Sequence, residues 1–241
     1  LINGLVLFLF QRPWLRPNLS TVSRSAITRL LHLGSLFFLL QVAMTLAFAS
    51  DNFVVARILG PEAVTQYAIP ARLFSFISLG LGLLLTPLWP AYTEAMARGD
   101  LAWVRRTLTR SLAMTALTSS LAAGLLLPSS IPLIHLWAGP TITPPLPLLS
   151  ALAVWSVLSA VGNALAIFLN ATGALKVQIL SAICMSLTAL TAKVLLAQIL
   201  GLPGIVWATV GAYTLLSALP LALYAYSILH TRNSIRYPMQ L

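Results

Sequence analysis

Charged residues are scarce in this sequence. Only 7% of its 241 residues are Asp, Glu, Lys or Arg, whereas 59% are hydrophobic. A protein of this composition cannot cover a folded core with a water-facing surface. The composition therefore excludes an ordinary soluble globular domain and points to the lipid bilayer as the solvent.

Catalytic and metal-binding motifs are also lacking. The sequence has no Gly-rich phosphate loop, no Cys/His spacing typical of a metal site and no carboxylate pair placed for acid–base chemistry. Its single cysteine, Cys184, excludes an intrachain disulfide. An enzyme is therefore the weaker hypothesis, and we expect no catalytic residues, metal site or cofactor.

Long apolar stretches are what the sequence does have. A helix needs about 20 mainly apolar residues to cross the hydrocarbon core of a bilayer. An apolar segment at 1–10 lacks the features of a signal peptide, and without a Met at its start it is expected to be the end of a preceding membrane helix. We predict a helix remnant and basic linker over 1–29, a lobe of six transmembrane helices over 30–230 and a tail over 231–241. The six spans are expected at about 30–56, 67–88, 107–127, 146–170, 177–198 and 204–229.

The basic residues predict the orientation of these spans. The net charge of +10 would suggest nucleic acid in a soluble protein, but here eleven of the 14 Lys and Arg fall on one side of the spans. Because Lys and Arg are enriched in cytoplasmic loops, both ends of the segment are expected in the cytoplasm, and nucleic acid is not an expected partner. These eleven are Arg12, Arg16, Arg24, Arg29, Arg98, Arg105, Arg106, Arg110, Lys176, Arg232 and Arg236.

Three ionisable residues lie near the outer ends of the first two spans. An ionisable group inside hydrocarbon costs roughly 2.5–3.5 kcal/mol on insertion scales, so Asp51, Arg57 and Arg72 should face protein or a water-filled cavity. The hairpin at Gly60-Pro61 would bring them to similar depth. In one interpretation the arginines attract an anionic substrate and Asp51 pairs with one of them or exchanges a proton. The alternative is a fixed ion pair at the outer interface.

Two asparagines of the fourth span are further candidates. Asn163 and Asn170 are two helical turns apart and so share one stripe of the helix. They could form interhelical hydrogen bonds or contact sugar hydroxyls, since an amide both donates and accepts. Lys193, close to the predicted outer end of the fifth span, is expected to snorkel to the membrane surface.

Several longer motifs resemble polysaccharide flippases of the O-antigen (Wzx) type. The segments 51–74 and 87–106, which contain Gly60-Pro61-Glu62 and Trp89-Pro90-Ala91-Tyr92, resemble the seventh and eighth helices of that family and the loop after them. Residues 136–140 and 162–170 are similar to an outer loop and the tenth helix. The likeness runs from about residue 30 to 230 and indicates the C-terminal half of a member of the superfamily that also contains the MATE drug exporters.

The resemblance implies a lobe that, with a second lobe, encloses a cavity open alternately to either side of the membrane. It implies transport of an oligosaccharide linked to undecaprenyl diphosphate across the bacterial inner membrane, with the lipid-linked oligosaccharide and the bilayer as partners. Arg57 and Arg72 would then bind the diphosphate, Asn163 and Asn170 the glycan, and Asp51 would be a coupling or charge-partner residue.

One departure and two alternatives accompany this interpretation. Family members have about twelve spans or more, so a missing N-terminal lobe or a second copy is expected to complete the pathway. A cation-coupled drug exporter is the first alternative, although a single intramembrane acid beside two arginines favours an anionic substrate. The second is a membrane-embedded glycosyltransferase or polymerase, for which the connection at about 90–106 is short and basic.

Overall fold

A computed structural model describes residues 23–231 of the chain, with the side chains of Ala26, Arg29 and Thr231 left out. The described part is built of helices, and six of them are long and apolar enough to cross a membrane. The predicted class, an all-α polytopic membrane protein, is thus confirmed. The predicted helix remnant at 1–10, most of the linker that follows it, and the basic residues Arg12, Arg16, Arg232 and Arg236 lie outside the described residues. The spans are Leu30–Ile58, Pro61–Leu85, Leu101–Ala138, Leu146–Ala171, Leu175–Leu200 and Leu202–His230.

The chain divides into two units, 1–38 and 39–241. Helix α2 (Arg24–Ile58) begins in the first unit, where leucines such as Leu30 and Leu31 are exposed, and ends in the second. The second unit contains the other elements. These are α3 (Pro61–Leu85), α4 (Leu88–Ala97), α5 (Leu101–Ala138), α6 (Leu146–Ala171), α7 (Leu175–Leu200), α8 (Leu202–Tyr213), the π-helix η4 (Thr214–Ala218) and α9 (Leu219–Thr231).

The connection between α2 and α3 is as tight as its sequence predicts. Gly60 has a φ of 95°, a left-handed conformation that glycine adopts without strain, and Pro61 occupies the first turn of α3. The helix therefore starts six residues before the predicted beginning of the span. Pro70 lies inside α3, where it removes one backbone donor.

The third span is longer than predicted because its prolines do not end it. Helix α5 runs through both Pro128 and Pro132 to Ala138. Nearby serine hydroxyls donate to carbonyls of this stretch, Ser129 to Leu125 at 3.0 Å and Ser130 to Leu127 at 2.7 Å. Such bonds help proline-containing membrane helices to satisfy their backbone.

Helix α4 occupies the stretch expected to be a polar loop. Its Tyr92 is fully buried and packs edge-on against Trp103 and Phe168, with ring centroids 5.9 and 5.5 Å away. The Tyr92 and Ser111 hydroxyls lie 3.3 Å apart and share a hydrogen bond. Burial raises the pKa of Tyr92 more than this bond lowers it, so the phenol stays protonated. These contacts fix α4 against α5 and α6.

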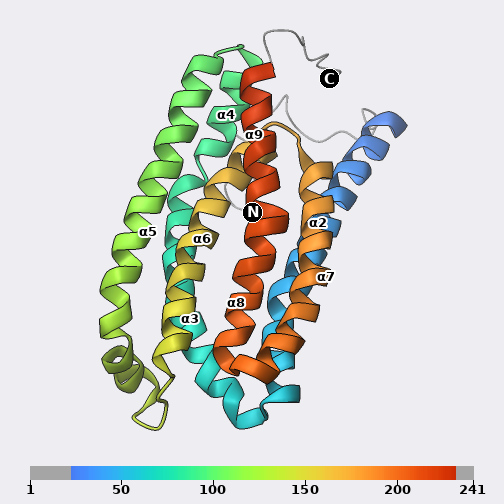
Figure 1. The fold of residues 1–241 in the computed structure, drawn as a ribbon. Helices are drawn as coiled ribbons and strands as arrows, with labels where there is room; N and C mark the ends of the chain where they lie inside the picture. The colour runs from blue at the N-terminus through green and yellow to red at the C-terminus, as the bar shows by residue number, and fades with distance from the viewer. Residues whose placement is uncertain (1–22, 232–241) are drawn as a thin grey trace, which may run out of the picture. The chain divides into compact units, whose positions relative to one another are not determined.

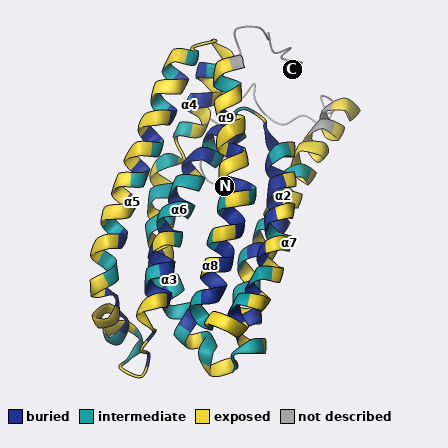
Figure 2. Cartoon of the chain, viewed as in Figure 1, coloured by how far each residue is buried: buried dark blue, intermediate teal, exposed yellow. Residues whose placement is uncertain are grey.

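Helix α6 is a central element of the packing in the second unit. Helix α6 lies beside α3, α5 and α8, and α7 forms a hairpin with α8 (Figure 1). Buried residues line the surfaces between helices, whereas exposed residues cover the outside (Figure 2). On α5, Leu117, Leu121 and Leu125 follow one another at four-residue spacing and are all exposed. In a membrane protein such a stripe faces lipid.

The sixth span is continuous but changes its winding. The π-helix η4 joins α8 to α9, and the Ser181 hydroxyl of α7 donates to the carbonyl of Leu216 within it. Single π-turns of this kind often occur at functional sites. Tyr213, the residue before η4, faces the cavity described below.

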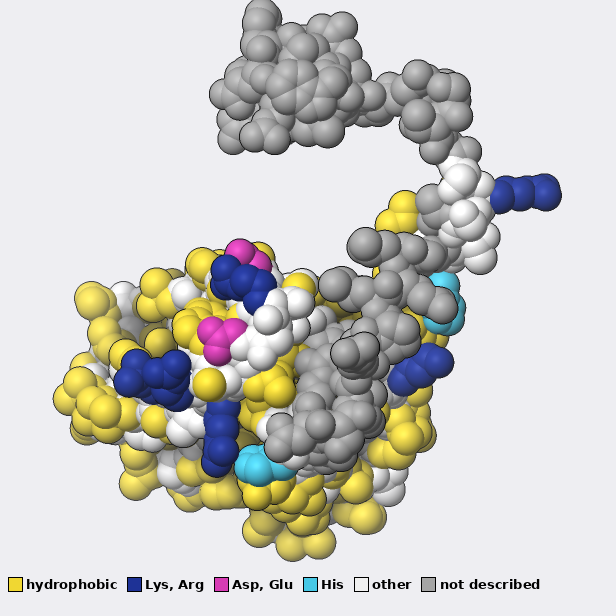
Figure 3. Space-filling model, turned by 90° about the horizontal axis from the view of Figure 1, so that it is seen from above, with side chains coloured by type: hydrophobic (Ala, Val, Ile, Leu, Met, Phe, Trp, Pro, Cys, Tyr) yellow, Lys and Arg dark blue, Asp and Glu magenta, His cyan; other side chains and the backbone are white. Residues whose placement is uncertain are grey.

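Basic side chains gather where α4 meets the start of α5. Figure 3 shows this end, with Lys and Arg side chains beside acidic ones. The exposed Arg98 pairs with Glu94 at 3.2 Å, while Arg105, Arg106 and Arg110 follow along the exposed side of α5. The segregation of charge predicted for loops after the second span is therefore present in the folded chain.

Candidate functional site

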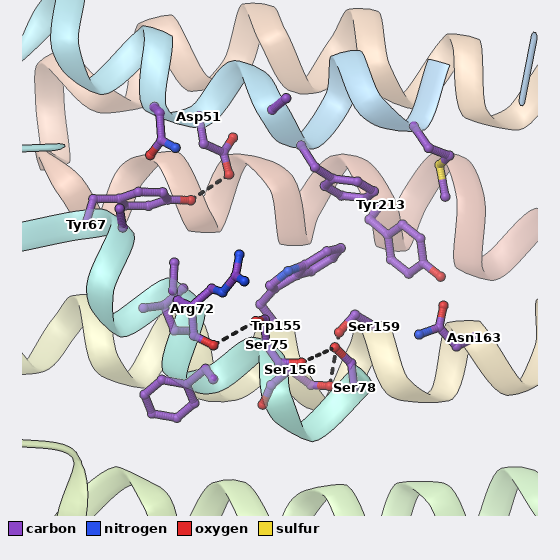
Figure 4. A pocket seen from close by; sticks show the side chains of 18 residues that line it. Asp51, Tyr67, Arg72, Ser75, Ser78, Trp155, Ser156, Ser159, Asn163 and Tyr213 are labelled. Atoms are coloured by element: carbon purple, nitrogen blue, oxygen red, sulfur yellow. Dashed lines mark hydrogen bonds between the residues drawn. The ribbon is translucent and has the colours of Figure 1, made fainter. Parts of the chain in front are cut away.

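The second unit contains a cavity of about 650 Å³ between the second half of α2, α3, α6 and α8. Every residue that lines it belongs to a membrane-spanning helix. Polar and aromatic side chains from all four helices converge on it (Figure 4). The lining consists of Met44, Phe48, Ala49, Asp51, Asn52, Tyr67, Ala68, Ala71, Arg72, Phe74, Ser75, Ser78, Leu152, Trp155, Ser156, Ser159, Asn163 and Tyr213.

Asp51 forms its ion pair with Lys193 of α7, not with Arg57 or Arg72. The Lys193 ammonium contacts Asp51 Oδ1 and donates to the carbonyl of Ala47, one turn earlier on α2. The Lys193 side chain is 0% exposed, so the prediction that it snorkels is wrong. The physical reason is that α7 continues to Leu200 and keeps Lys193 about two turns from its end, where a lysine needs a partner inside the protein.

Tyr67 holds the other oxygen of the same carboxylate. Its hydroxyl donates to Asp51 Oδ2 at 2.6 Å, a short distance typical of a hydrogen bond to a charged acceptor. Asp51 is thus bound from α3 and α7 at once, and its side chain is only 16% exposed. The arrangement joins three helices through one carboxylate at the wall of the cavity.

Arg72 is the cation that faces the cavity. Its side chain is exposed and extends from α3 into the space that Asp51 and Tyr67 border (Figure 4). Within residues 23–231 its guanidinium makes no ion pair and no hydrogen bond. An arginine in this state offers up to five N–H donors to an anion.

Arg57 does not share this position. It is exposed in the last turn of α2, where a positive charge complements the helix dipole, and it is not among the residues of the cavity. Asp51, Arg57 and Arg72 were expected to lie close together, but only Asp51 and Arg72 line the same cavity. The two predicted arginines have different surroundings.

The two predicted asparagines also separate. Asn163 is exposed to the cavity, with its amide nitrogen 3.8 Å from the position that a Cβ would take at Gly82. Asn170, near the end of α6, accepts a hydrogen bond from Gln178 of α7 at 3.0 Å and is not a lining residue. Asn170 thus makes the interhelical bond, while Asn163 keeps its amide toward the cavity.

Three aromatic rings form a wall of the cavity, which we call the aromatic wall. Trp155 of α6 lies between Phe48 of α2 and Tyr213 of α8, with centroid distances of 5.4 and 5.3 Å. The Tyr213 hydroxyl occupies the place of a side chain at Gly162, since a Cβ there would lie 1.8 Å from it. Gly162 therefore allows α6 and α8 to approach with Tyr213 between them.

Serine hydroxyls complete the polar lining. Ser75 donates to the carbonyl of Arg72 at 2.7 Å, Ser78 to that of Ser75 at 3.1 Å and Ser159 to that of Ser156 at 3.1 Å. Each hydroxyl oxygen then retains lone pairs as acceptors. Among the residues that the structure describes, the cavity lining thus combines one free cation, hydroxyl acceptors, an amide and aromatic faces.

Sequence reasoning missed Tyr67 and Trp155 as lining residues and Lys193 as the partner of Asp51. The pairing of Lys193 could have been predicted, because ionisable residues inside a membrane usually pair with one another and Asp51 was identified as an intramembrane acid. Trp155 carried no comparable signal, since an aromatic residue in an apolar span is expected to pack. Among the described residues, no group of three His, Cys, Asp or Glu could hold a metal ion.

A family model described as a polysaccharide biosynthesis protein matches residues 2–119, just under half of the chain. The match includes Asp51, Arg72 and the motifs Gly60-Pro61-Glu62 and Trp89-Pro90-Ala91-Tyr92, which confirms the resemblance to polysaccharide biosynthesis proteins found from the sequence. Segments 136–140 and 162–170 lie beyond it. No curated protein and no solved structure matches the chain.

Proposed function

Residues 2–119 of this multi-pass membrane protein match the polysaccharide biosynthesis family, and from that premise we propose that it acts in a flippase for a lipid-linked oligosaccharide. The substrate would be a glycan carried on undecaprenyl diphosphate, moved across the bacterial inner membrane for cell-surface polysaccharide synthesis. Members of such a pathway must bind a diphosphate, a glycan and a lipid chain at once. The cavity offers groups suited to the diphosphate and the glycan.

The proposal rests on Arg72, whose guanidinium faces the cavity and has no partner among the described residues. A guanidinium without a protein partner inside a membrane protein is costly, and in transporters such a group marks a substrate path. The diphosphate would supply the missing anion, and arginine can bind phosphate oxygens through two parallel hydrogen bonds. Arg57, at the helix end outside the cavity, has no part in this contact.

The other lining residues suit a sugar. Asn163 can donate to and accept from sugar hydroxyls, and the serine oxygens can accept from them. The face of Trp155 offers an apolar surface against which the C–H groups of a sugar ring can pack. The exposed leucines outside the bundle fit a bilayer environment in which the lipid chain remains.

Transport by alternating access requires a second wall. The cavity lies within one unit of the chain, so we propose that an N-terminal lobe or a second copy closes the path from the other side. The basic end at α4 and α5 would face the cytoplasm, as would both ends of the segment.

A drug exporter is the second candidate, because the aromatic wall is a suitable surface for a flat organic cation. The charge of the cavity is less favourable to it. Asp51, the acid of the cavity, already has Lys193 as its partner, and Arg72 would repel a cationic drug. A membrane-embedded glycosyltransferase is less favoured, since the membrane-helical fold and the matched family suggest a transporter.

Deletion of the complete gene in its host, followed by measurement of lipid-linked oligosaccharide in the cytoplasmic leaflet, tests the proposal. We expect the finished unit to accumulate there without a change in tolerance to cationic drugs. Complementation with R57Q should restore export, whereas R72Q should reduce it by at least about tenfold at equal protein level. Unchanged glycolipid with increased drug sensitivity would identify the exporter instead.

A further inference from the structure

We propose that Lys193 sets the charge selectivity of the cavity, although it lies behind the cavity wall and touches no ligand. It is a positioning residue that neutralises Asp51 and thereby leaves Arg72 as the unbalanced charge. The inference rests on the proposed function for the identity of the anion, a lipid diphosphate.

The cavity is bordered by one acid and one base from different helices. Asp51 on α2 and Arg72 on α3 both line it, and Lys193 on α7 does not. Without Lys193, the lining would carry one negative and one positive group facing the same space. An ion pair across that space, or a net charge of zero, would remove the attraction for an anion.

Lys193 removes Asp51 from this balance. Its ammonium, which is not part of the cavity lining, contacts Asp51 and also donates to the Ala47 carbonyl. The Tyr67 hydroxyl takes the remaining carboxylate oxygen at 2.6 Å. Each carboxylate oxygen thus has a partner from another helix, and no bond between Asp51 and Arg72 is present in the described chain.

Because Lys193 is buried, water screens its interaction with Asp51 only weakly. A charge in contact with water is screened within several ångströms, whereas a buried charge in a low dielectric acts over longer distances. The side chain of Lys193 is 0% exposed, and its ammonium lies against Asp51 and the Ala47 carbonyl of α2. The pair therefore contributes little net field to the cavity, and the field of Arg72 remains.

A purely structural ion pair and a charge-setting pair differ in one measurable respect. Loss of either partner leaves a buried unpaired charge and lowers stability. For a structural pair, both losses should weaken ligand binding as well. For a charge-setting pair, K193M adds a negative charge beside the cavity and D51N adds a positive one, so the affinity for a diphosphate must move in opposite directions.

The test measures binding of farnesyl diphosphate and of farnesol to the purified full chain in nanodiscs, together with the thermal unfolding midpoint. We expect K193M to weaken farnesyl diphosphate binding by about tenfold and D51N to leave it equal or several-fold tighter, while both lower the midpoint. The double variant D51N/K193M should bind within about twofold of the original chain. Affinity for farnesol should not change, and K176M, which alters the exposed lysine of the same helix, is the matched control.

If K193M and D51N weaken diphosphate binding alike, or if K193M binds as the original chain does, Lys193 does not set the selectivity. Should K193M fail to fold, the double variant and D51N still decide, because a charge-setting pair requires the double variant to bind normally and D51N not to bind more weakly. If the original chain binds farnesol as tightly as farnesyl diphosphate, the diphosphate of the proposed function is itself wrong.

Discussion

The carboxylate of Asp51 is bound at both oxygens by residues from two other helices. Lys193 of α7 and Tyr67 of α3 are its partners, and the Ala47 carbonyl also accepts a hydrogen bond from the Lys193 ammonium. An isolated ion in a membrane interior is expensive, whereas a paired ion with hydrogen bonds on its remaining atoms is tolerated. The carboxylate of Asp51 thus connects α2 with α3 and α7, and these contacts offset the cost of burying its charge.

Tyr67 allows this junction to be tested without changing a formal charge. In Y67F the ring remains and only the hydroxyl that donates to Asp51 Oδ2 is lost. A hydrogen bond to a charged group contributes about 1.5–3 kcal/mol, so we expect a lower thermal unfolding midpoint in detergent. Y224F, which alters a partly exposed tyrosine of α9, should leave the midpoint unchanged. Equal midpoints for both variants would show that the Tyr67 bond does not stabilise the fold.

Residue chemistry identified the charges of the site better than their partners. The sequence shows that Asp51 and Arg72 fall within apolar spans, and both line the cavity. Lys193 lies 142 positions after Asp51, a separation that no helical periodicity connects. Its pairing depends on how α7 packs against α2, which is a property of the assembled bundle.

At the scale of elements, the α7–α8 hairpin depends on a backbone contact. Gly201 has a positive φ of 67° at the turn, and Gly204 follows in the first turn of α8. A Cβ at Gly204 would lie 2.1 Å from the carbonyl oxygen of Leu196. Since this neighbour is backbone of the preceding helix, the two helices could not keep their separation.

The variant G204A should therefore destabilise the chain. Overpacking of this kind costs about 1–3 kcal/mol, and a clash with backbone is relieved less easily than one with a flexible side chain. In G211A, on the same helix, the added Cβ meets nothing within 4 Å, and exchange of glycine for alanine in a helix stabilises by about 0.5–1 kcal/mol. Thermal unfolding in detergent should give shifts of opposite sign. A G204A midpoint at or above that of the original chain would contradict the close contact.

Element boundaries were predictable where the backbone alone decides them. Gly60-Pro61 ends α2 and starts α3, as its conformational preferences require. The third span was expected to end at about 127, just before Pro128, yet α5 continues through Pro128 and Pro132, where serine hydroxyls bond to backbone carbonyls. The sequence has no comparable local pattern that predicts helix α4 or the π-helix η4. Their contacts are with other helices: Tyr92 of α4 packs against Phe168 of α6, and Leu216 of η4 accepts a hydrogen bond from Ser181 of α7.

For the whole molecule, the division between apolar and basic surface is what the sequence predicted most directly. Apolar runs of sufficient length gave six spans, and the structure has six such helices in the described part. The cavity was not predictable in its full form, because it requires side chains from four helices that lie far apart in sequence. Charge and hydropathy define which segments enter the membrane, whereas helix packing decides which of their polar groups meet.

The same division predicts which connections face the cytoplasm. The native sequence has one cysteine, Cys184, which lies in the middle of α7, so C184S provides a cysteine-free background. Because basic residues favour the cytoplasmic side, R98C and K176C should react with a membrane-impermeant maleimide only after cells are opened. E62C and T143C, exposed at the α2–α3 and α5–α6 connections, should react in intact spheroplasts. All four reacting from the same side would contradict the six-span arrangement, and the reverse pattern would show that the basic end of α4 and α5 faces outward.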